Sequence, residues 1–141
     1  DPIHVDIRQG LNWDLPFDDA AFGYALGWNS LYYMRDEQAD FDEHVAELGR
    51  VIRPGGHLVA CVPTPTCFSL EEAEDLGSEL IRLRTRSKWS MLNGTIYRRF
   101  RSTADIERAF DSHFEDFSWA RLSDDCYGLR LDYFVFTCRR R

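Results

Sequence analysis

The sequence has 141 residues and a mass of 16.5 kDa, which suits one domain and rules out two complete ones. Hydrophobic residues make up 44% of it, so the chain can bury a core and is neither disordered nor collagen-like. Its net charge of −7 disfavours general nucleic-acid binding, which needs cations spread over a whole face.

No apolar run approaches the ~18–20 residues that span a bilayer, and the first residues lack the basic start of a signal peptide. We therefore expect no membrane or targeting segment. The four cysteines form no C-x-x-C pair and no zinc-type pattern with the histidines, which predicts no metal site and a reduced, cytoplasmic setting. Cys61 and Cys138 lie in apolar runs and are expected in the core.

The first half of the chain shows strand and helix signals in turn. Residues 3–7 are short and β-branched, which indicates a strand. The run at 22–28 is apolar without alternation, as in a parallel strand buried on both faces. Asp40 is placed to cap a helix over 39–53, in which the apolar residues recur at helical spacing: Phe41, Val45, Leu48 and Ile52.

A tight turn follows that helix, because Pro54 cannot continue it and Gly55-Gly56 reverses the chain. The apolar residues 57–62 then predict a buried strand that Pro63 ends. Helix, turn and buried strand in this order form half of a βαβ unit.

The second half predicts two more helices and two hairpins. Ser69 with Glu72 resembles a capping box, which predicts a helix over 69–81. Asn93-Gly94 predicts a small hairpin between 89–92 and 95–97. Ser102 with Asp105 predicts a helix that reaches Phe110, and the apolar runs 114–122 and 129–138 predict an antiparallel pair.

Three segments in order carry a resemblance to a known family: L-P-F-D-D-A-A-F at 15–22, L-Y-Y at 31–33, and E-L-G-R-V-I-R-P-G-G-H-L at 47–58. They resemble the class I S-adenosylmethionine-dependent methyltransferases of the small-molecule type. The resemblance implies an α/β, Rossmann-like sheet that ends in an antiparallel hairpin. It covers the chain from about Asp6 to Arg139.

The family holds its cofactor on a Gly-rich turn after its first strand, and this sequence contains no G-x-G. We therefore expect residues 1–141 to be a partial domain, the C-terminal half without the Gly-rich N-terminal half. The alternative is a degenerate, non-catalytic module that keeps the fold for protein interaction or regulation. A third option is one half of a nucleotide-binding dehydrogenase, but the P-G-G segment and the final antiparallel hairpin match methyltransferases better.

The resemblance implies S-adenosylmethionine as the cofactor and assigns residues to it. Asp6, in a V-D-I context, is the best candidate for the carboxylate that receives the adenine amino group, with Ile7 beside it. The usual carboxylate spacing falls instead on Gly10-Leu11. Gly27, Trp28 and Asn29 follow a strand at the place where the family approaches the methionine part. Asn29 equally suits a local turn role, and the Asp residues equally suit a solvated loop.

Residues 82–101 hold seven basic and no acidic side chains, interleaved with aromatic ones, and the resembled family caps its acceptor site here. This favours a substrate lid over 82–101 and a small anionic acceptor held by Tyr33, Trp89, Tyr97, Arg98 and Arg99. A solvated surface paired with acidic residues is the alternative. A His at the site of Tyr33, frequent in the family, is excluded as a base, and no catalytic residue is assigned.

The function implied by the resemblance is methyl transfer from S-adenosylmethionine to a small molecule. Without its earlier strands the strand at 22–28 would lie at a sheet edge with unpaired backbone groups. We therefore also expect a homodimer through that edge.

Overall fold

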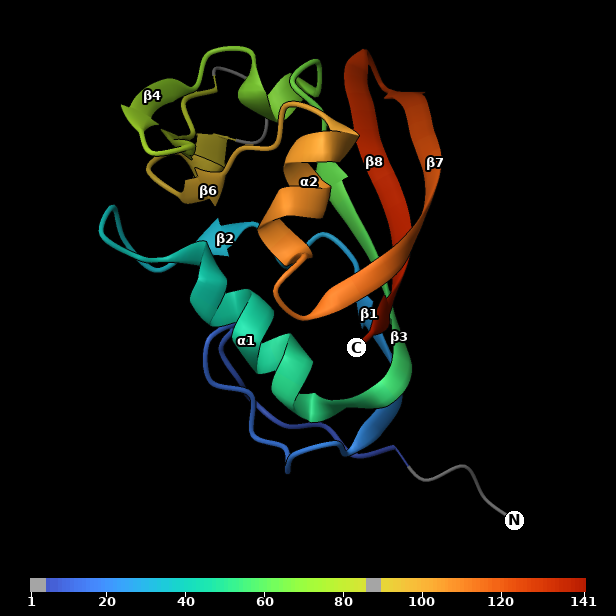
Figure 1. Ribbon diagram of the computed structural model, residues 1–141. Helices are drawn as coiled ribbons and strands as arrows, with labels where there is room; N and C mark the ends of the chain where they lie inside the picture. The colour runs from blue at the N-terminus through green and yellow to red at the C-terminus, as the bar shows by residue number, and fades with distance from the viewer. Residues whose placement is uncertain (1–4, 86–89) are drawn as a thin grey trace.

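The computed structural model describes residues 5–85 and 90–141. In this part of the chain two four-stranded sheets and two α-helices form a mixed α/β fold (Figure 1). The elements in chain order are β1 (Phe22–Gly27), β2 (Tyr33–Met34), α1 (Phe41–Val51), β3 (Ile52–Pro63), β4 (Glu74–Gly77), β5 (Leu80–Arg82), β6 (Ile96–Arg98), α2 (Thr103–Phe110), β7 (Phe114–Cys126) and β8 (Leu129–Arg140).

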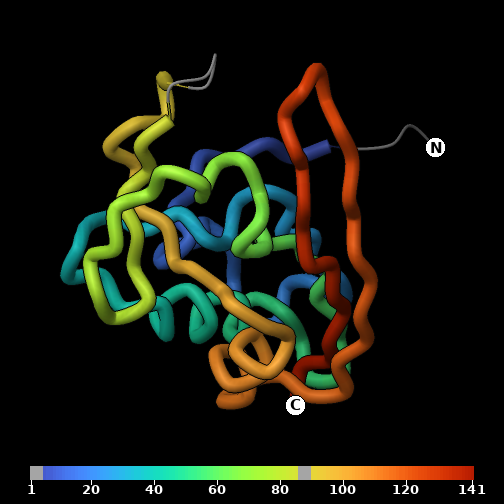
Figure 2. The backbone as a smooth tube through the Cα atoms, turned by 90° about the horizontal axis from the view of Figure 1, so that it is seen from above, coloured from blue at the N-terminus to red at the C-terminus, as the bar shows by residue number. Residues whose placement is uncertain are grey.

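The larger sheet has the strand order β1-β3-β8-β7. β1 and β3 are parallel, whereas β3 with β8 and β8 with β7 are antiparallel. This confirms the parallel strand, the strand after the P-G-G turn and the final antiparallel pair. The expectation that β1 is buried on both faces is wrong, because Tyr24 and Leu26 on its outer face are exposed and no described element covers them. The long β7–β8 hairpin runs along one side of the molecule (Figure 2).

Both helices begin as their caps predict. The Asp40 side chain accepts from the backbone N–H of Asp42 at the start of α1, and the Ser102 side chain accepts from that of Asp105 at the start of α2. Their apolar faces meet the larger sheet in one core, which includes Val45, Leu58, Ile106, Phe110, Phe114 and Phe136. Cys61 and Cys138 are buried free thiols, as expected.

The predicted helix over 69–81 is wrong. Its residues form a 3-10 turn (Phe68–Leu70) and then β4 and β5, and the Ser69 hydroxyl donates to the Cys67 Sγ instead of capping a helix. Gly77, Ser78 and Glu79 all have positive φ and make the turn between the strands. Leu80 and Ile81 are buried opposite β6. Pairing with that distant strand outweighs the local helix pattern.

The hairpin predicted around Asn93-Gly94 is correct in its turn and its second strand but wrong in its first strand. Gly94 has a φ of +88°, and the turn leads into β6, but residues 90–92 form a 3-10 turn and the partners of β6 are β2 and β5. These short strands and β4 form the smaller sheet, with the order β2-β6-β5-β4.

The strand expected over residues 3–7 is also not observed. Residues 5–7 are exposed and carry no strand, while residues 3 and 4 lie outside the described residues. No described strand pairs with the open side of β1. This strand therefore lies at the edge of its sheet, as the sequence analysis predicts. No helix in the described part of the chain is long and apolar enough to cross a membrane.

Candidate functional site

A cavity of about 370 Å³ lies where β1 and β3 end. Because the two strands are parallel, their carboxyl ends meet at one edge of the sheet, which is where open α/β sheets bind ligands. The smaller sheet adds β2 and β6 to this edge. The cavity is lined by Trp28, Asn29, Tyr32, Tyr33, Phe68, Ser69, Leu92, Tyr97, Leu122, Leu131 and Tyr133.

The turn after β1 forms one wall of this cavity. Asn29 has a φ of +52°, a left-handed conformation that asparagine tolerates better than most residues. Its backbone N–H donates to the Cys61 Sγ at 3.3 Å, and its Oδ1 accepts from the same thiol at 3.3 Å. Asn29 thus ties the turn to β3. It has the local turn role that the sequence analysis gave as the alternative to ligand binding.

Tyrosine rings form the opposite wall. The rings of Tyr32 and Tyr33 stack with centroids 5.1 Å apart, and both meet the ring of Tyr97 edge to face, at 4.7 and 4.6 Å. Burial raises the pKa of Tyr32, Tyr97 and Tyr133 above the ordinary tyrosine value. These phenols are therefore neutral at physiological pH.

The structure brings four of the expected site residues together, since Trp28, Asn29, Tyr33 and Tyr97 all line the cavity. Gly27 lies directly below them and is buried. A Cβ on Gly27 would stand 2.6 Å from Leu31 side-chain atoms, so close packing already accounts for this glycine. Their binding roles stay predictions.

Asp6, Ile7 and Leu11, which the resemblance assigns to the adenosine, lie outside the cavity. Asp6 forms an ion pair with Arg8, whose guanidinium donates to the Pro16 carbonyl, and Ile7 is exposed. Leu11 forms a small bridge with Asp14 next to Asn12. Asp6, Ile7 and Leu11 are absent from the lining of the cavity.

The five described arginines of the basic segment are paired with carboxylates from other segments. Arg98 lies 3.2 Å from Asp105, and Arg99 lies 2.7 Å from Asp75. Arg82, Arg84 and Arg101 are likewise paired, with Glu37, Glu74 and Glu79 among their partners. The alternative of a surface paired with acidic residues is therefore present: most of the carboxylates come from residues before the basic segment, and Asp105 comes from α2 after it. Trp89 lies outside the described residues.

Sequence reasoning missed seven lining residues: Tyr32, Phe68, Ser69, Leu92, Leu122, Leu131 and Tyr133. Tyr133 pairs with Pro63 at the carboxyl end of β3, so correct alignment of the last hairpin with β3 would have found it. Phe68 and Ser69 had been placed on a helix that does not form.

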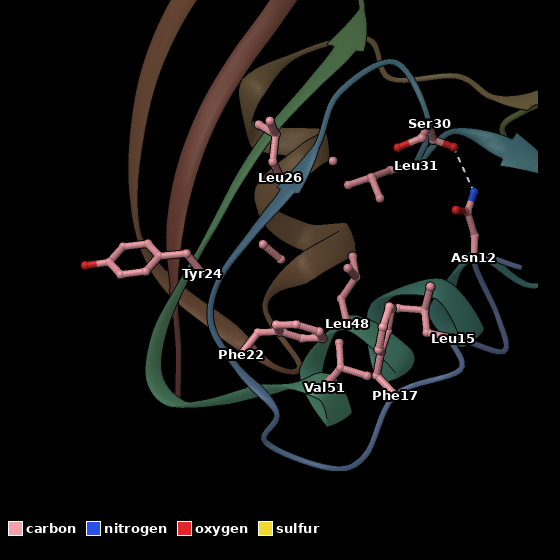
Figure 3. A pocket seen from close by; sticks show the side chains of 12 residues that line it. Asn12, Leu15, Phe17, Phe22, Tyr24, Leu26, Ser30, Leu31, Leu48 and Val51 are labelled. Carbon is pink, nitrogen blue, oxygen red and sulfur yellow. Dashed lines mark hydrogen bonds between the residues drawn. The ribbon is translucent and has the colours of Figure 1, made fainter. Parts of the chain in front are cut away.

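A second hollow, of about 240 Å³, runs along the open edge of β1 (Figure 3). It is largely apolar, with Phe22 and Leu31 from the β1 region facing Leu48 and Val51 of α1. Asn12 closes one end through a hydrogen bond of 2.7 Å from its Nδ2 to the Ser30 carbonyl.

The histidines and cysteines offer no metal site within residues 5–85 and 90–141, where no group of three or more suitable side chains gathers. His44 is buried, and its Nδ1 lies 3.0 Å from the Leu31 carbonyl, to which it donates. Burial lowers the pKa of His44 and raises that of the Cys61 thiol, which keeps both groups neutral.

Comparison with known proteins identifies the fold. No protein-family model and no curated protein sequence matches the chain. Among solved structures, an S-adenosylmethionine-dependent methyltransferase of Thermotoga maritima matches with a TM-score of 0.64 and 17% identity over 97% of this chain and 65% of its own. The 1,6-didemethyltoxoflavin-N1-methyltransferase of Burkholderia thailandensis, solved with that substrate and S-adenosylhomocysteine, matches with a TM-score of 0.62 and 19% identity over 92% of this chain and 48% of its own.

A third match, from Haloferax volcanii, is a methyltransferase in complex with its Trm112 activator, with a TM-score of 0.59 and 17% identity over 93% of this chain and 59% of its own. The chain spans about half to two thirds of the length of these structures. At such low identities the agreement concerns the fold. The chain has the α/β fold of the C-terminal half of a class I S-adenosylmethionine-dependent methyltransferase catalytic domain.

Proposed function

We propose that the protein transfers a methyl group from S-adenosylmethionine to a small molecule. One observation carries this proposal: a cavity of small-molecule size lies at the carboxyl ends of β1 and β3, in a chain with the methyltransferase fold. The cofactor belongs to the proposal, and two solved neighbours, of which one methylates geranyl diphosphate, contain S-adenosylhomocysteine.

The residues at the cavity fit the methionine end of that cofactor. Asn29 is exposed, and its Nδ2 makes no hydrogen bond to the residues the structure describes, so this amide is left to donate to a ligand. Gly27 and Trp28 bring the backbone to the same edge. For the adenosine we retain Asp6, Ile7 and Leu11 as candidates. When bound, S-adenosylmethionine supplies an activated methyl group on a sulfonium, which an acceptor lone pair takes as the thioether leaves.

The cavity provides positioning more than proton transfer. Its described lining contains no carboxylate, histidine or lysine, and burial raises the pKa of Tyr32, Tyr97 and Tyr133. Alignment of an already nucleophilic acceptor atom is therefore the main contribution of these residues.

We also propose that residues 82–101 act as a lid over the acceptor. Leu92 and Tyr97 of this segment line the cavity, which supports this role. An anionic acceptor held by Arg98 and Arg99 stays a prediction from the sequence. Their ion pairs with Asp105 and Asp75 would first have to open.

A non-catalytic methyltransferase-like module is the second candidate. The lack of any G-x-G in the sequence favours it, since that turn is where the family approaches its cofactor most closely. Under either function we propose a cytoplasmic protein with small-molecule partners and no nucleic-acid or membrane partner. We also propose a homodimer through the edge of β1, where Tyr24 and Leu26 are 73% and 69% exposed.

Calorimetric titration with S-adenosylhomocysteine separates the two functions. We expect weak or no binding by these 141 residues alone and micromolar binding by the complete gene product. Replacing Asn29 with Ala in the complete product should weaken that binding, while the exposed control Tyr127→Ala on the β7–β8 turn should leave it unchanged. A complete gene product that binds neither S-adenosylhomocysteine nor S-adenosylmethionine would refute methyl transfer and favour the non-catalytic module.

A further inference from the structure

The chemistry of the cavity lining restricts what the site can accept. Its described side chains are aromatic, aliphatic, amide or hydroxyl groups, and none of them carries a charge at neutral pH. The described charged groups directly next to the lining residues along the chain are paired with other side chains. Arg98 and Arg99 are paired with carboxylates, and the fully buried Asp132 is paired with Arg121 at 2.6 Å.

An ion of either sign would lose hydration in this cavity without gaining a countercharge from the described lining, which makes its entry costly. A sulfonium cofactor at the same edge sharpens the restriction for cations, because a second positive charge would lie close to the first. An uncharged ligand avoids both penalties.

The walls of the cavity also favour a flat ligand. Trp28 is 45% exposed and Tyr33 is half-buried, so each presents ring surface at the site. Phe68 and Tyr133 widen this aromatic lining. Aromatic rings stack in offset or edge-to-face arrangements, which select planar partners. The free Nδ2 of Asn29 adds a donor for a ring nitrogen or carbonyl oxygen.

Resting on the proposed function, we infer that the methyl acceptor is an uncharged, planar aromatic or heteroaromatic molecule. It lies between the Trp28 and Tyr33 rings in the cavity at the carboxyl ends of β1 and β3. About 370 Å³ is within the size range of small-molecule sites and accommodates one fused ring system. This acceptor differs from the anionic one that the arginine count suggests.

Three ring-matched probes test the inference on the chain as it stands: neutral indole, anionic indole-3-carboxylate and cationic tryptamine. Their binding is followed by NMR through the ring resonances of tyrosine-labelled protein. We expect millimolar binding of indole with shifts at Tyr33 and Tyr97, and at least about tenfold weaker binding of both charged probes.

Variants locate the site and test the charge argument. Tyr33→Leu should weaken indole binding several-fold, whereas Tyr24→Leu, which changes an exposed tyrosine of β1 outside the cavity, should not. Leu122 lines the cavity and is 42% exposed, so Leu122→Arg should be tolerated and should raise the affinity for indole-3-carboxylate. A spectrum with native dispersion confirms that each variant folds.

Three results would overturn the inference. Indole-3-carboxylate binding more tightly than indole, with loss of that binding in Arg99→Gln, would restore the anionic acceptor. Tryptamine binding most tightly would indicate a cationic one. Lack of indole binding at several millimolar would show that the cavity is not an acceptor site. Because no cofactor is needed, indole selectivity without S-adenosylhomocysteine binding by the complete gene product would refute methyl transfer and leave the ligand class intact.

Discussion

The packing of Gly27 against Leu31, two residues that line the second hollow, gives the sharpest stability prediction. In Gly27→Ala the new Cβ would stand 2.6 Å from both the Cγ and the Cδ1 of Leu31. Leu31 is only 5% exposed, so its side chain can yield only toward the hollow that it lines and not into solvent. The φ of Gly27 is not positive, so alanine brings no backbone strain there.

Two opposing effects set the magnitude. Overpacking a core position costs about 1–3 kcal/mol. Replacing glycine by alanine at a permitted conformation returns about 0.4–1 kcal/mol, because the unfolded chain loses freedom. The midpoints of these two ranges give a net loss of about 1.3 kcal/mol in the free energy of unfolding. Gly23→Ala is the matched control in the same strand, because its Cβ would meet the Arg53 guanidinium, the far end of an exposed side chain.

Urea unfolding with an unchanged m-value measures both variants. Gly23→Ala should lie within about 0.5 kcal/mol of the unchanged protein, as surface changes usually do. Leu31→Ala by itself should cost about 2–5 kcal/mol, and the double variant with Gly27→Ala should cost less than the sum of the two single changes. A Gly27→Ala protein as stable as the original, or strictly additive costs in the double variant, would refute the steric explanation.

Three further outcomes are expected. Burial lowers the pKa of His44 below its ordinary value of 6.5, so the unfolded chain takes up the proton first and the free energy of unfolding should fall as the pH drops below 6.5. Urea titrations at two pH values should show a smaller fall in His44→Gln; an equal fall would assign the effect to other groups. Light scattering should detect a concentration-dependent dimer that Leu26→Lys, a charge on the exposed edge strand, disperses, and a stable monomer at high concentration contradicts the edge argument. Ellman's reagent should modify the exposed Cys126 quickly and the buried thiols slowly, because burial raises the pKa of Cys138 to about 12; fast reaction at all four thiols would contradict this burial.

Short-range signals in the sequence determined the elements that form through local interactions. Asp40 and Ser102 cap α1 and α2 because their side chains reach backbone N–H groups two or three residues ahead. The apolar runs at 114–122 and 129–138 predicted the β7–β8 pair, whose strands are neighbours along the chain. The apolar run at 22–28 predicted the parallel strand β1 but not the exposure of its outer face.

Tertiary structure decided the segment from Ser69 to Arg82. Its apolar spacing suits a helix, yet Ile81 pairs with Tyr97 of β6 and is buried there. The free energy of that pairing depends on residues far along the chain, which a local pattern does not contain. The same holds for the basic segment, where Asp75 and Asp105 supply countercharges that only the folded chain brings to Arg99 and Arg98.

The candidate site likewise combines residues that the sequence predicted with residues that only the tertiary structure brings to the cavity. Motif resemblance located Asn29 and Tyr33 at the end of a strand, because the carboxyl ends of parallel strands follow from strand order alone. Phe68 and Tyr133 reach the cavity only through the packing of the 3-10 turn and the register of β8 against β3. The sequence by itself determined the fold class and indicated the strand end where the candidate cavity lies, and long-range packing decided the aromatic, uncharged lining of that cavity.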